Sequence, residues 1–579
     1  MNQQSNQRFD TKPYEPLILS ITLAVAIFFV RYSEIAEWDL GDNDNFMRLH
    51  QVMTFIESPS WYLQPLKDFN PQDGQIIHWS RIPDLPILAL YYVSQLFVDH
   101  TTALQISIAI VPLIYLVSFI LILCRISKEL FGIERHILTT IYTFFSIVAV
   151  KFHPGNIDHH NLQVLLYSCF IFFTFSPNIK HKAHVYGSAI SISTSLLVGL
   201  EVLPFFIITL VLLTFYALYN DLNKLKFIRD LSLLTFVFGM FGIMIFQPVS
   251  IWFNPQYDIV TLPLLCFFLS AALSISLTLL NSRLTILLIT TFSCIGLTWL
   301  IFPNVLKSPY SDYPEPLVTY WLSHVSEARP LTTVIKNSSG LSHIWFYIVT
   351  IVPALLSILL LKDRKQKLYY ILFVISLIPA IFWQVRTIIF SSMLAIPLNL
   401  TVGLYLFQII NIPVLRTLPP FLITPVLSTI IVSQIEILLG VDNTEKDVKV
   451  KIVSTHDFIN NINISGKIIF APMDSGAEIV TLTDNYIIAA PYHRNIQGNL
   501  LYINTLLSDN QELAYENLKS RGIELFLFDK NDNQNKLIIK DANPNSIIRS
   551  ISDGNPPKWL FPLSDDGHGR TIYEFKGKK

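Results

Sequence analysis

Apolar and polar positions follow one another in long blocks along this chain. Thirteen apolar runs have roughly the length of a membrane-spanning helix: 15–33, 103–124, 137–152, 161–176, 184–199, 201–219, 231–247, 260–280, 284–303, 343–361, 369–382, 388–408 and 419–438. Short polar segments separate most of them. The pattern therefore predicts a polytopic α-helical membrane protein with about 13 spans. The apolar run 84–98 is short for a span, and we expect an interfacial helix there.

The basic residues of the short connections indicate the orientation of these spans. They lie on one side of the membrane, the cytoplasmic side, if 84–98 does not cross; they are Arg125, Lys128, Arg135, Lys180, Lys182, Lys224, Lys226, Arg229, Arg283, Lys362, Arg364, Lys365 and Lys367. This predicts a cytoplasmic N-terminus. It also predicts outer loops at 34–102, 153–160 and 304–342, with everything beyond 440 on the outer side.

The hydropathy pattern changes at about Val441. From there the chain reads "KIIFAP", "YIIAAP" and "IELFLFD" as short buried strands, and "NQELAYENLKSRG" as a helix that stops at a glycine. Strands alternating with a helix indicate an α/β fold. We therefore predict a membrane domain over 1–439 and a soluble extracytoplasmic α/β domain over 440–579.

Composition agrees with a membrane protein and excludes several other classes. Of the 579 residues, 52% are hydrophobic and only 14% are charged, against roughly 25% charged in soluble domains. The formal net charge of −1 offers no basic field for nucleic acid. The four cysteines fall in apolar runs without metal-binding spacing, which indicates core residues. No cleavage pattern follows the first apolar run, so we expect a retained first span.

Polar residues with chemical potential gather in the predicted outer loops. The first loop holds "WDLGDNDNFMRLHQ", the second "NIDHHN" at the mouth of a span, and the third "YWLSHVSEARP". Charged groups placed against an apolar helix are costly and often functional. Carboxylates and imidazoles converging at one interface are suited to a divalent cation, Mg²⁺ or Mn²⁺. Such a cation would neutralise a phosphate leaving group.

Taken in order, these motifs resemble the catalytic subunit of oligosaccharyltransferase, a membrane glycosyltransferase of the GT-C fold. The resemblance implies that Asp44 in "GDNDNFMR" binds the metal and the acceptor, with Asp42 as second choice. It implies that Asp158 is a metal ligand. His160 stands where the family has a second acidic residue, and we expect it to be a neutral metal ligand or an ion-pair partner of Asp158. The resemblance also implies that Glu327 in "HVSEARP" is a metal or acceptor ligand.

Three further stretches extend the resemblance. "FWQVRTII" places Arg386 where the family contacts the lipid pyrophosphate, and "HWSR" and "PYHRN" resemble a bacterial branch of such proteins. His78 and Arg81 of "HWSR" are expected on the donor phosphate or the acceptor. The other expected acceptor-side residues are Asp42, Arg48, Asp474, His493 and Arg494.

One departure from the family concerns the acceptor. The family motif W-W-D-Y-G reads the hydroxyl of an Asn-X-Ser/Thr acceptor, and here "PMDSG" keeps only Asp474 and Gly476. Pro472 and Met473 replace the tryptophans, and Ser475 replaces the tyrosine. The sequence therefore predicts an acceptor other than this sequon.

The function implied is transfer of a sugar or oligosaccharide from a polyprenyl-(pyro)phosphate donor, with inversion expected. Asp44 and Glu327 would orient the acceptor as the catalytic residues, and the partners would be the lipid-linked donor, membrane lipid, and a glycan, lipid or protein acceptor. A flippase of a lipid-linked glycan and a non-catalytic scaffold remain alternatives, although charged midplane residues and repeats typical of transporters are scarce. Many Lys, Asn and Ile residues indicate an AT-rich genome, and no eukaryotic retention signal is seen. We therefore expect a bacterial inner-membrane protein.

Overall fold

The computed structural model describes residues 14–176, 181–254, 256, 258–281, 284–303, 313–338, 340–410, 422–440 and 454–576. These form two compact units. The helical unit comprises Met1–Asp39, Trp79–Lys307 and Pro330–Asn443. The sheet unit comprises Leu40–His78, Ser308–Arg329 and Thr444–Lys579. The predicted boundary near Val441 lies outside the described residues.

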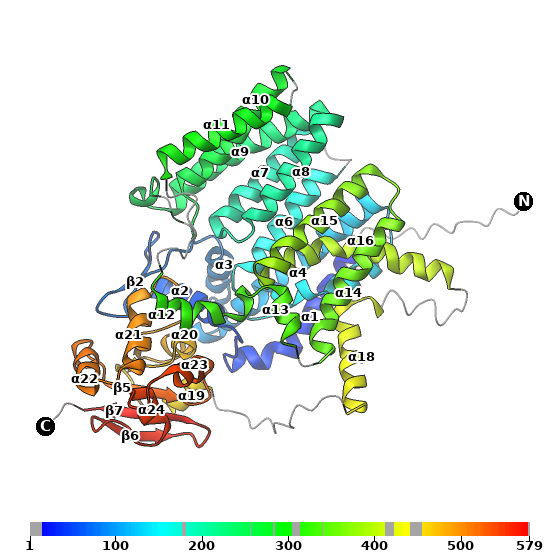
Figure 1. Cartoon of the computed structure of the whole chain (residues 1–579). Coiled ribbons are helices and arrows are strands. Elements are labelled where there is room, and N and C mark those ends of the chain that lie inside the picture. Colours follow the sequence, from blue (N-terminus) through cyan, green and yellow to red (C-terminus); the bar gives the residue numbers. More distant parts are fainter. Residues whose placement is uncertain are drawn as a thin grey trace, which may run out of the picture. The chain divides into compact units, whose positions relative to one another are not determined.

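The helical unit is a bundle of long apolar helices joined by short turns (Figure 1). Its elements are α1 (Glu15–Ala36), α3 (Asp84–Ser94), α4 (His100–Phe131), α5 (His136–Phe144), η1 (Ile147–Phe152), α6 (His160–Phe175), α7 (His181–Val198), α8 (Leu203–Asn220), α9 (Leu222–Phe246), η2 (Val249–Ile251), α10 (Leu262–Asn281), α11 (Leu284–Ile301), α13 (Leu331–Lys336), α14 (Ser342–Leu356), η6 (Ser357–Leu359), α15 (Arg364–Phe382), η7 (Val385–Thr387), α16 (Ile388–Ile409) and α18 (Pro425–Leu438).

Burial divides these helices into a core and a periphery. The most apolar window of the α16 region is 89% buried, and α16 packs against α4, α6, α14 and α15. By contrast, α9, α10 and α11 lie side by side (Figure 1), and only 11% of the α11 window is buried. Large apolar side chains exposed on such a helix are those expected to face lipid.

Local sequence explains where the helices begin and end. Asp99 caps α4 by accepting from the backbone N–H of Thr102 at 3.0 Å, as short polar side chains commonly do. The same helix ends at Gly132, whose φ of 68° is the left-handed conformation that glycine adopts without penalty. Spanning 32 residues, α4 is about 48 Å long at 1.5 Å per residue, enough to cross a bilayer.

The predicted fold class is confirmed, with one correction to the helices. Within the described part of the chain, nine helices are long and apolar enough to cross a membrane. The predicted span 137–152 is instead two pieces, α5 and the 3₁₀ segment η1. The break is at Ser146, whose backbone is extended between the two pieces. The residues 419–421 of the last predicted span lie outside the described residues.

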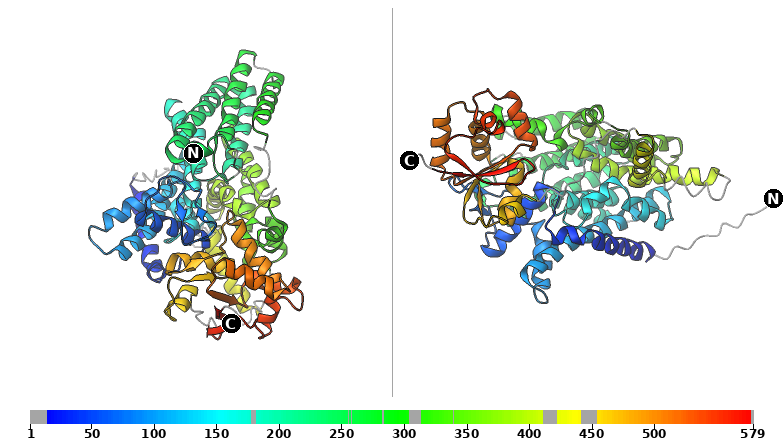
Figure 2. Two further views of the ribbon diagram at one scale, coloured as in Figure 1. Left: turned by 90° about the vertical axis from the view of Figure 1, so that its left-hand side faces the viewer. Right: turned by 90° about the horizontal axis from the view of Figure 1, so that it is seen from below.

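The sheet unit contains one mixed sheet and a small hairpin. Its elements are α2 (Asn43–Glu57), β1 (Pro65–Leu66), β2 (Gln75–Ile76), α12 (Glu315–Tyr320), η4 (Leu322–His324), η5 (Ser326–Ala328), α19 (Thr455–Asn460), β3 (Ile468–Phe470), α20 (Met473–Leu482), β4 (Tyr486–Ile487), α21 (Ile496–Leu507), α22 (Gln511–Ser520), β5 (Leu525–Asp529), α23 (Asn533–Asp541), α24 (Ile547–Ser552), β6 (Leu560–Asp565) and β7 (Arg570–Phe575). Figure 2 shows the unit from two further sides.

The three predicted strands and the predicted helix α22 all occur. The sheet order is β4-β3-β5-β7-β6. Strands β4, β3 and β5 are parallel, and β7 runs antiparallel to both of its neighbours, β5 and β6. The rings of Phe470 and Phe526 lie 5.1 Å apart at the centre of the core. The side chains of the edge strand β6 are largely exposed. Its sequence therefore lacks the alternation of apolar and polar residues that predicts a strand.

Candidate active site

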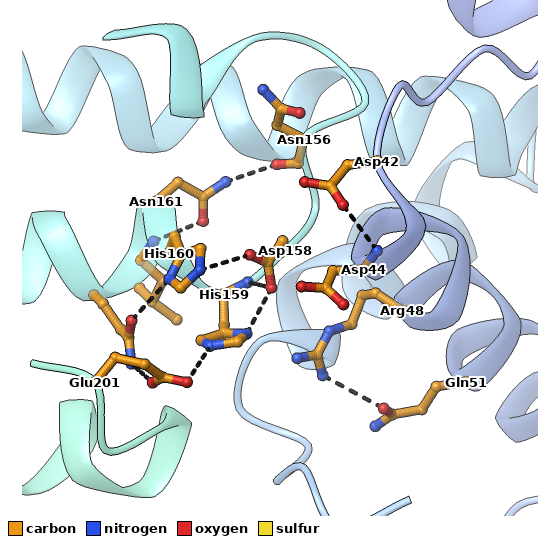
Figure 3. Close-up of polar contacts among 12 residues, drawn as sticks. Asp42, Asp44, Arg48, Gln51, Asn156, Asp158, His159, His160, Asn161 and Glu201 are labelled. Atoms are coloured by element: carbon orange, nitrogen blue, oxygen red, sulfur yellow. Dashed lines mark hydrogen bonds and ion pairs between the residues drawn. The ribbon is translucent and has the colours of Figure 1, made fainter. Parts of the chain in front are cut away.

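Helix α2 positions the first group of predicted residues, within the sheet unit. Asp42 is its N-cap and accepts from the backbone N–H of Asp44 at 3.2 Å. Asp44 itself lies half-buried in the first turn, where the helix dipole favours a negative charge. Arg48 is fully buried, one turn further along, and its Nη1 lies 3.5 Å from Oε1 of Gln51 (Figure 3). Asp42 therefore shapes the helix terminus that presents Asp44.

The "DHH" residues lie just before and at the start of α6, in the helical unit. Gly155, with a φ of 86°, turns the chain there. His159 and His160 are each 5% exposed, and the side chain of Asp158 is 11% exposed. The ring of Trp79 lies 6.2 Å from that of His159. Three titratable groups are thus enclosed at the mouth of an apolar helix (Figure 3).

His159 is held between two carboxylates. Its Nδ1 lies 2.6 Å from Oδ1 of Asp158, and its Nε2 lies 3.3 Å from Oε1 of Glu201. Burial would lower the pKa of His159, but the two carboxylates raise this pKa to about 10. Burial would also raise the pKa of Asp158, but the charge and the hydrogen bond of His159 hold this pKa well below its usual range. His159 is therefore an imidazolium at neutral pH.

His160 belongs to a second chain of contacts, through Gln163. Nδ1 of His160 lies 3.3 Å from Oε1 of Gln163, and Nε2 of Gln163 donates to Oε2 of Glu201 at 2.9 Å. Nε2 of His160 lies 3.4 Å from Oδ2 of Asp158 (Figure 3). The sequence motifs did not indicate Glu201 or Gln163 as site residues. Two signals were present: a carboxylate at the start of the apolar run 201–219, and a glutamine three residues after His160 on the same helix face.

The facing atoms of Asp158 and His160 fit a divalent cation. Ligands about 2.0–2.2 Å from a metal stand about 3.0 to 3.4 Å apart on adjacent coordination positions, and the observed separation is 3.4 Å. One oxygen and one imidazole nitrogen form a donor set suited to Mn²⁺ or Zn²⁺. Both side chains are largely enclosed, which strengthens their interaction with a cation.

The two predicted phosphate-binding arginines lie in the helical unit and have different surroundings. Arg386 lies half-buried in η7 and donates through Nε to Oε1 of Gln384 at 2.8 Å. Arg81 is 2% exposed, and its Nη1 forms a buried ion pair with Asp84 at 3.0 Å. The Arg81 guanidinium therefore already neutralises the buried carboxylate of Asp84, which is a structural role.

The sheet unit brings the two motifs "HWSR" and "PYHRN" together through His78. The hydroxyl of Tyr492 lies 2.6 Å from Nδ1 of His78, and the ring centroids of His78 and His493 are 4.9 Å apart. Beneath them Asn495 is fully buried. Its Oδ1 accepts from Asn70 and Gln75 at 3.1 and 3.2 Å, which ties the two chain segments together.

The remaining predicted residues are more exposed. Glu327 lies half-buried in the short segment η5, and Arg494 is also half-buried. Asp474 is exposed in the first turn of α20. Gly476 has a packing reason, because a Cβ there would lie 2.0 Å from the carbonyl oxygen of Ala489.

No protein-family model and no curated protein sequence matches the chain. Solved structures do. One is the archaeal oligosaccharyltransferase AglB from Archaeoglobus fulgidus, in complex with an inhibitory peptide and a dolichol-phosphate. The match covers 97% of this chain and 74% of the AglB chain, with a TM-score of 0.64 and 13% sequence identity. The Archaeoglobus fulgidus oligosaccharyltransferase in complex with Zn and sulfate matches 96% over 72% of its own chain, with a TM-score of 0.58 and 13% identity.

ArnT from Cupriavidus metallidurans in the apo state matches 96% of this chain over 97% of its own, with a TM-score of 0.50 and 10% identity. These neighbours are GT-C glycosyltransferases. The chain has the GT-C fold. The resemblance that the motifs indicated is thereby confirmed at the level of the fold.

Proposed function

We propose that the protein is a membrane glycosyltransferase that transfers a sugar or oligosaccharide from a polyprenyl-(pyro)phosphate donor to an acceptor on the extracytoplasmic side. The observation that carries this proposal is the enclosed Asp158–His159–His160 cluster at the mouth of α6. The GT-C fold supports it, since one neighbour is an oligosaccharyltransferase in complex with a dolichol-phosphate.

The helical unit would handle the charged end of the donor. Asp158 and His160 are proposed to hold a divalent cation, Mn²⁺ or Mg²⁺, and the resemblance to the family is the reason to propose Asp44 and Glu327 as further ligands. A bound cation would supply neutralisation of the phosphate leaving group. Arg386 is proposed to bind phosphate oxygens, because its planar guanidinium presents two donors in the spacing of a phosphate.

The other predicted residues receive narrower roles. His78 is proposed as a further donor to the phosphate, with Tyr492 holding its ring. The buried pair with Asp84 leads us to propose that Arg81 supports this loop instead of contacting the ligand. Asp44 and Glu327 would orient the acceptor and accept its proton, in a direct displacement that inverts the anomeric centre.

The acceptor is proposed to differ from an Asn-X-Ser/Thr sequon. α20 carries Asp474 without the aromatic residues of W-W-D-Y-G. Asp42, Arg48, His493 and Arg494 are proposed to lie on the acceptor side. We further propose a bacterial inner-membrane location, with the N-terminus cytoplasmic and the C-terminal segment extracytoplasmic, because this orientation agrees with the basic connections.

The test is the cellular pool of polyprenyl-linked glycans, measured by mass spectrometry of extracted lipids. Cells with Glu327→Gln or Asp158→Asn should accumulate a sugar-loaded lipid, because transfer is blocked after the donor is made. Asp509→Asn makes the same kind of change at an exposed position and is the control. An unchanged pool in both variants, with folded protein present, would refute the transferase. Accumulation confined to the inner leaflet would instead indicate a flippase.

A further inference from the structure

The hydrogen bonds between Glu201, Gln163 and His160 have a direction that their chemistry determines. A carboxylate only accepts hydrogen bonds, so the Gln163 atom that faces Oε2 of Glu201 must be the amide nitrogen. The amide oxygen then faces Nδ1 of His160 at 3.3 Å. Because that oxygen only accepts, Nδ1 of His160 must carry the proton.

This proton position decides what the other ring nitrogen can do. A neutral imidazole with its proton on Nδ1 has a lone pair on Nε2. Nε2 of His160 lies 3.4 Å from Oδ2 of Asp158. A lone pair and a carboxylate oxygen that face each other without a proton between them attract a cation.

We propose that Glu201 and Gln163 form a relay of positioning residues that sets His160 as a neutral Nε2 ligand for a divalent metal. The proposal rests on the proposed function for the presence of that metal. Metal-ligating histidines commonly have their second ring nitrogen held by such a partner, and loss of the partner typically costs 10- to 100-fold in metal affinity.

The surroundings of Glu201 keep this relay in one arrangement. The other oxygen, Oε1, faces Nε2 of His159 at 3.3 Å, so both carboxylate oxygens have a donor. Gly199 lies directly against the relay, because a Cβ there would be 2.5 Å from Oε2 of Glu201 and 2.8 Å from Nε2 of Gln163. Only a residue without a side chain leaves the observed contacts intact.

The relay also predicts which metals bind. An imidazole nitrogen in place of a second carboxylate removes one hard oxygen ligand from the site. Imidazole suits Mn²⁺ and Zn²⁺, whereas Mg²⁺ prefers oxygen ligands throughout. We therefore expect the site to bind Mn²⁺ or Zn²⁺ more tightly than Mg²⁺.

The experiment is Mn²⁺ binding to the purified full-length protein in detergent, followed by electron paramagnetic resonance of free and bound Mn²⁺. Gln163→Leu and Glu201→Leu should each weaken binding by about 10- to 100-fold and remove the nitrogen coupling of the bound ion. Gln511→Leu, the same change at an exposed position of α22, should leave both unchanged.

A double variant separates the relay from a general effect on folding. Exchanging the two residues, with Glu201→Gln and Gln163→Glu together, keeps the charge and rebuilds the chain of hydrogen bonds. The new amide at position 201 can donate to the new carboxylate at position 163, and that carboxylate accepts from Nδ1 of His160. Affinity and nitrogen coupling should return. Wild-type Mn²⁺ affinity in Gln163→Leu would overturn the relay, and so would failure of the exchange in a folded protein. Neither result bears on the lipid pool, which tests transfer independently.

Discussion

Replacing Gly199 by alanine tests the packing of this cluster with a single methyl group. The new Cβ would lie 2.5 Å from Oε2 of Glu201, whereas ordinary contacts begin at 3.4 Å. Oε2 must therefore retreat by about 0.9 Å and Nε2 of Gln163, 2.8 Å from the same Cβ, by about 0.6 Å, and these unequal shifts strain the 2.9 Å bond between the two atoms toward the limit of hydrogen-bond range. A lost bond to a charged group costs about 1.5–3 kcal/mol.

Two measurements would follow this change. We expect the unfolding free energy in mixed detergent micelles to fall by about 1.5–3 kcal/mol, and Mn²⁺ affinity to fall about 10-fold or more. Gly296→Ala is the matched control, because a Cβ at Gly296 in α11 meets nothing within 4 Å. A Gly199→Ala protein with the stability and Mn²⁺ affinity of the wild type would refute this close packing around Glu201.

Two further predictions concern the sheet unit. Asn495→Ala removes four hydrogen bonds at 2.8 to 3.2 Å, to Asn70, Gln75, Ile488 and Asn499. We expect thermal unfolding of the full chain to show a loss of about 3 kcal/mol or more in unfolding free energy. An unchanged unfolding midpoint would contradict this. Burial raises the pKa of Asp532 to about 7, so the folded state holds that proton more tightly than the unfolded one, and stability falls as pH rises from about 4 through 7. Asp532→Asn keeps the cap on Asn535 without the buried charge, and should be more stable than wild type by about 1–3 kcal/mol at pH 8 but not at pH 4; an equal difference at both pH values would argue against the raised pKa.

Much of the fold can be predicted from the sequence because its causes are local. Length and hydropathy are sufficient for α1, α4 and α16, since a helix in lipid must satisfy all its backbone hydrogen bonds internally. Buried runs such as Ile468–Phe470 likewise indicate strands. The prediction failed at Ser146, whose extended backbone separates α5 from η1 inside an apolar run. Hydropathy does not register such a local break.

The individual motifs of the candidate site were also visible in the sequence, and their partners were not. "DHH" marks Asp158 and His160 because charged groups beside an apolar helix are costly. Nothing in the sequence pairs them with Glu201, which lies 38 residues from Gln163 along the chain. The contact exists because α6, which begins at His160, packs against α7, which ends at Val198 shortly before Glu201.

The membership of the sheet unit has the same origin. Residues 40–78 and 308–329 pack with the C-terminal segment, through contacts such as Thr481 donating to the carbonyl of Phe46 and Asn495 bonding Asn70. The sequence alone determined that this chain forms apolar helices with acidic and histidine motifs at their ends, because helix formation in lipid depends on composition over about 20 neighbouring residues. Tertiary structure decided which nitrogen of His160 carries its proton, since that depends on two side chains that only the packed bundle brings within 3.3 Å of their partners.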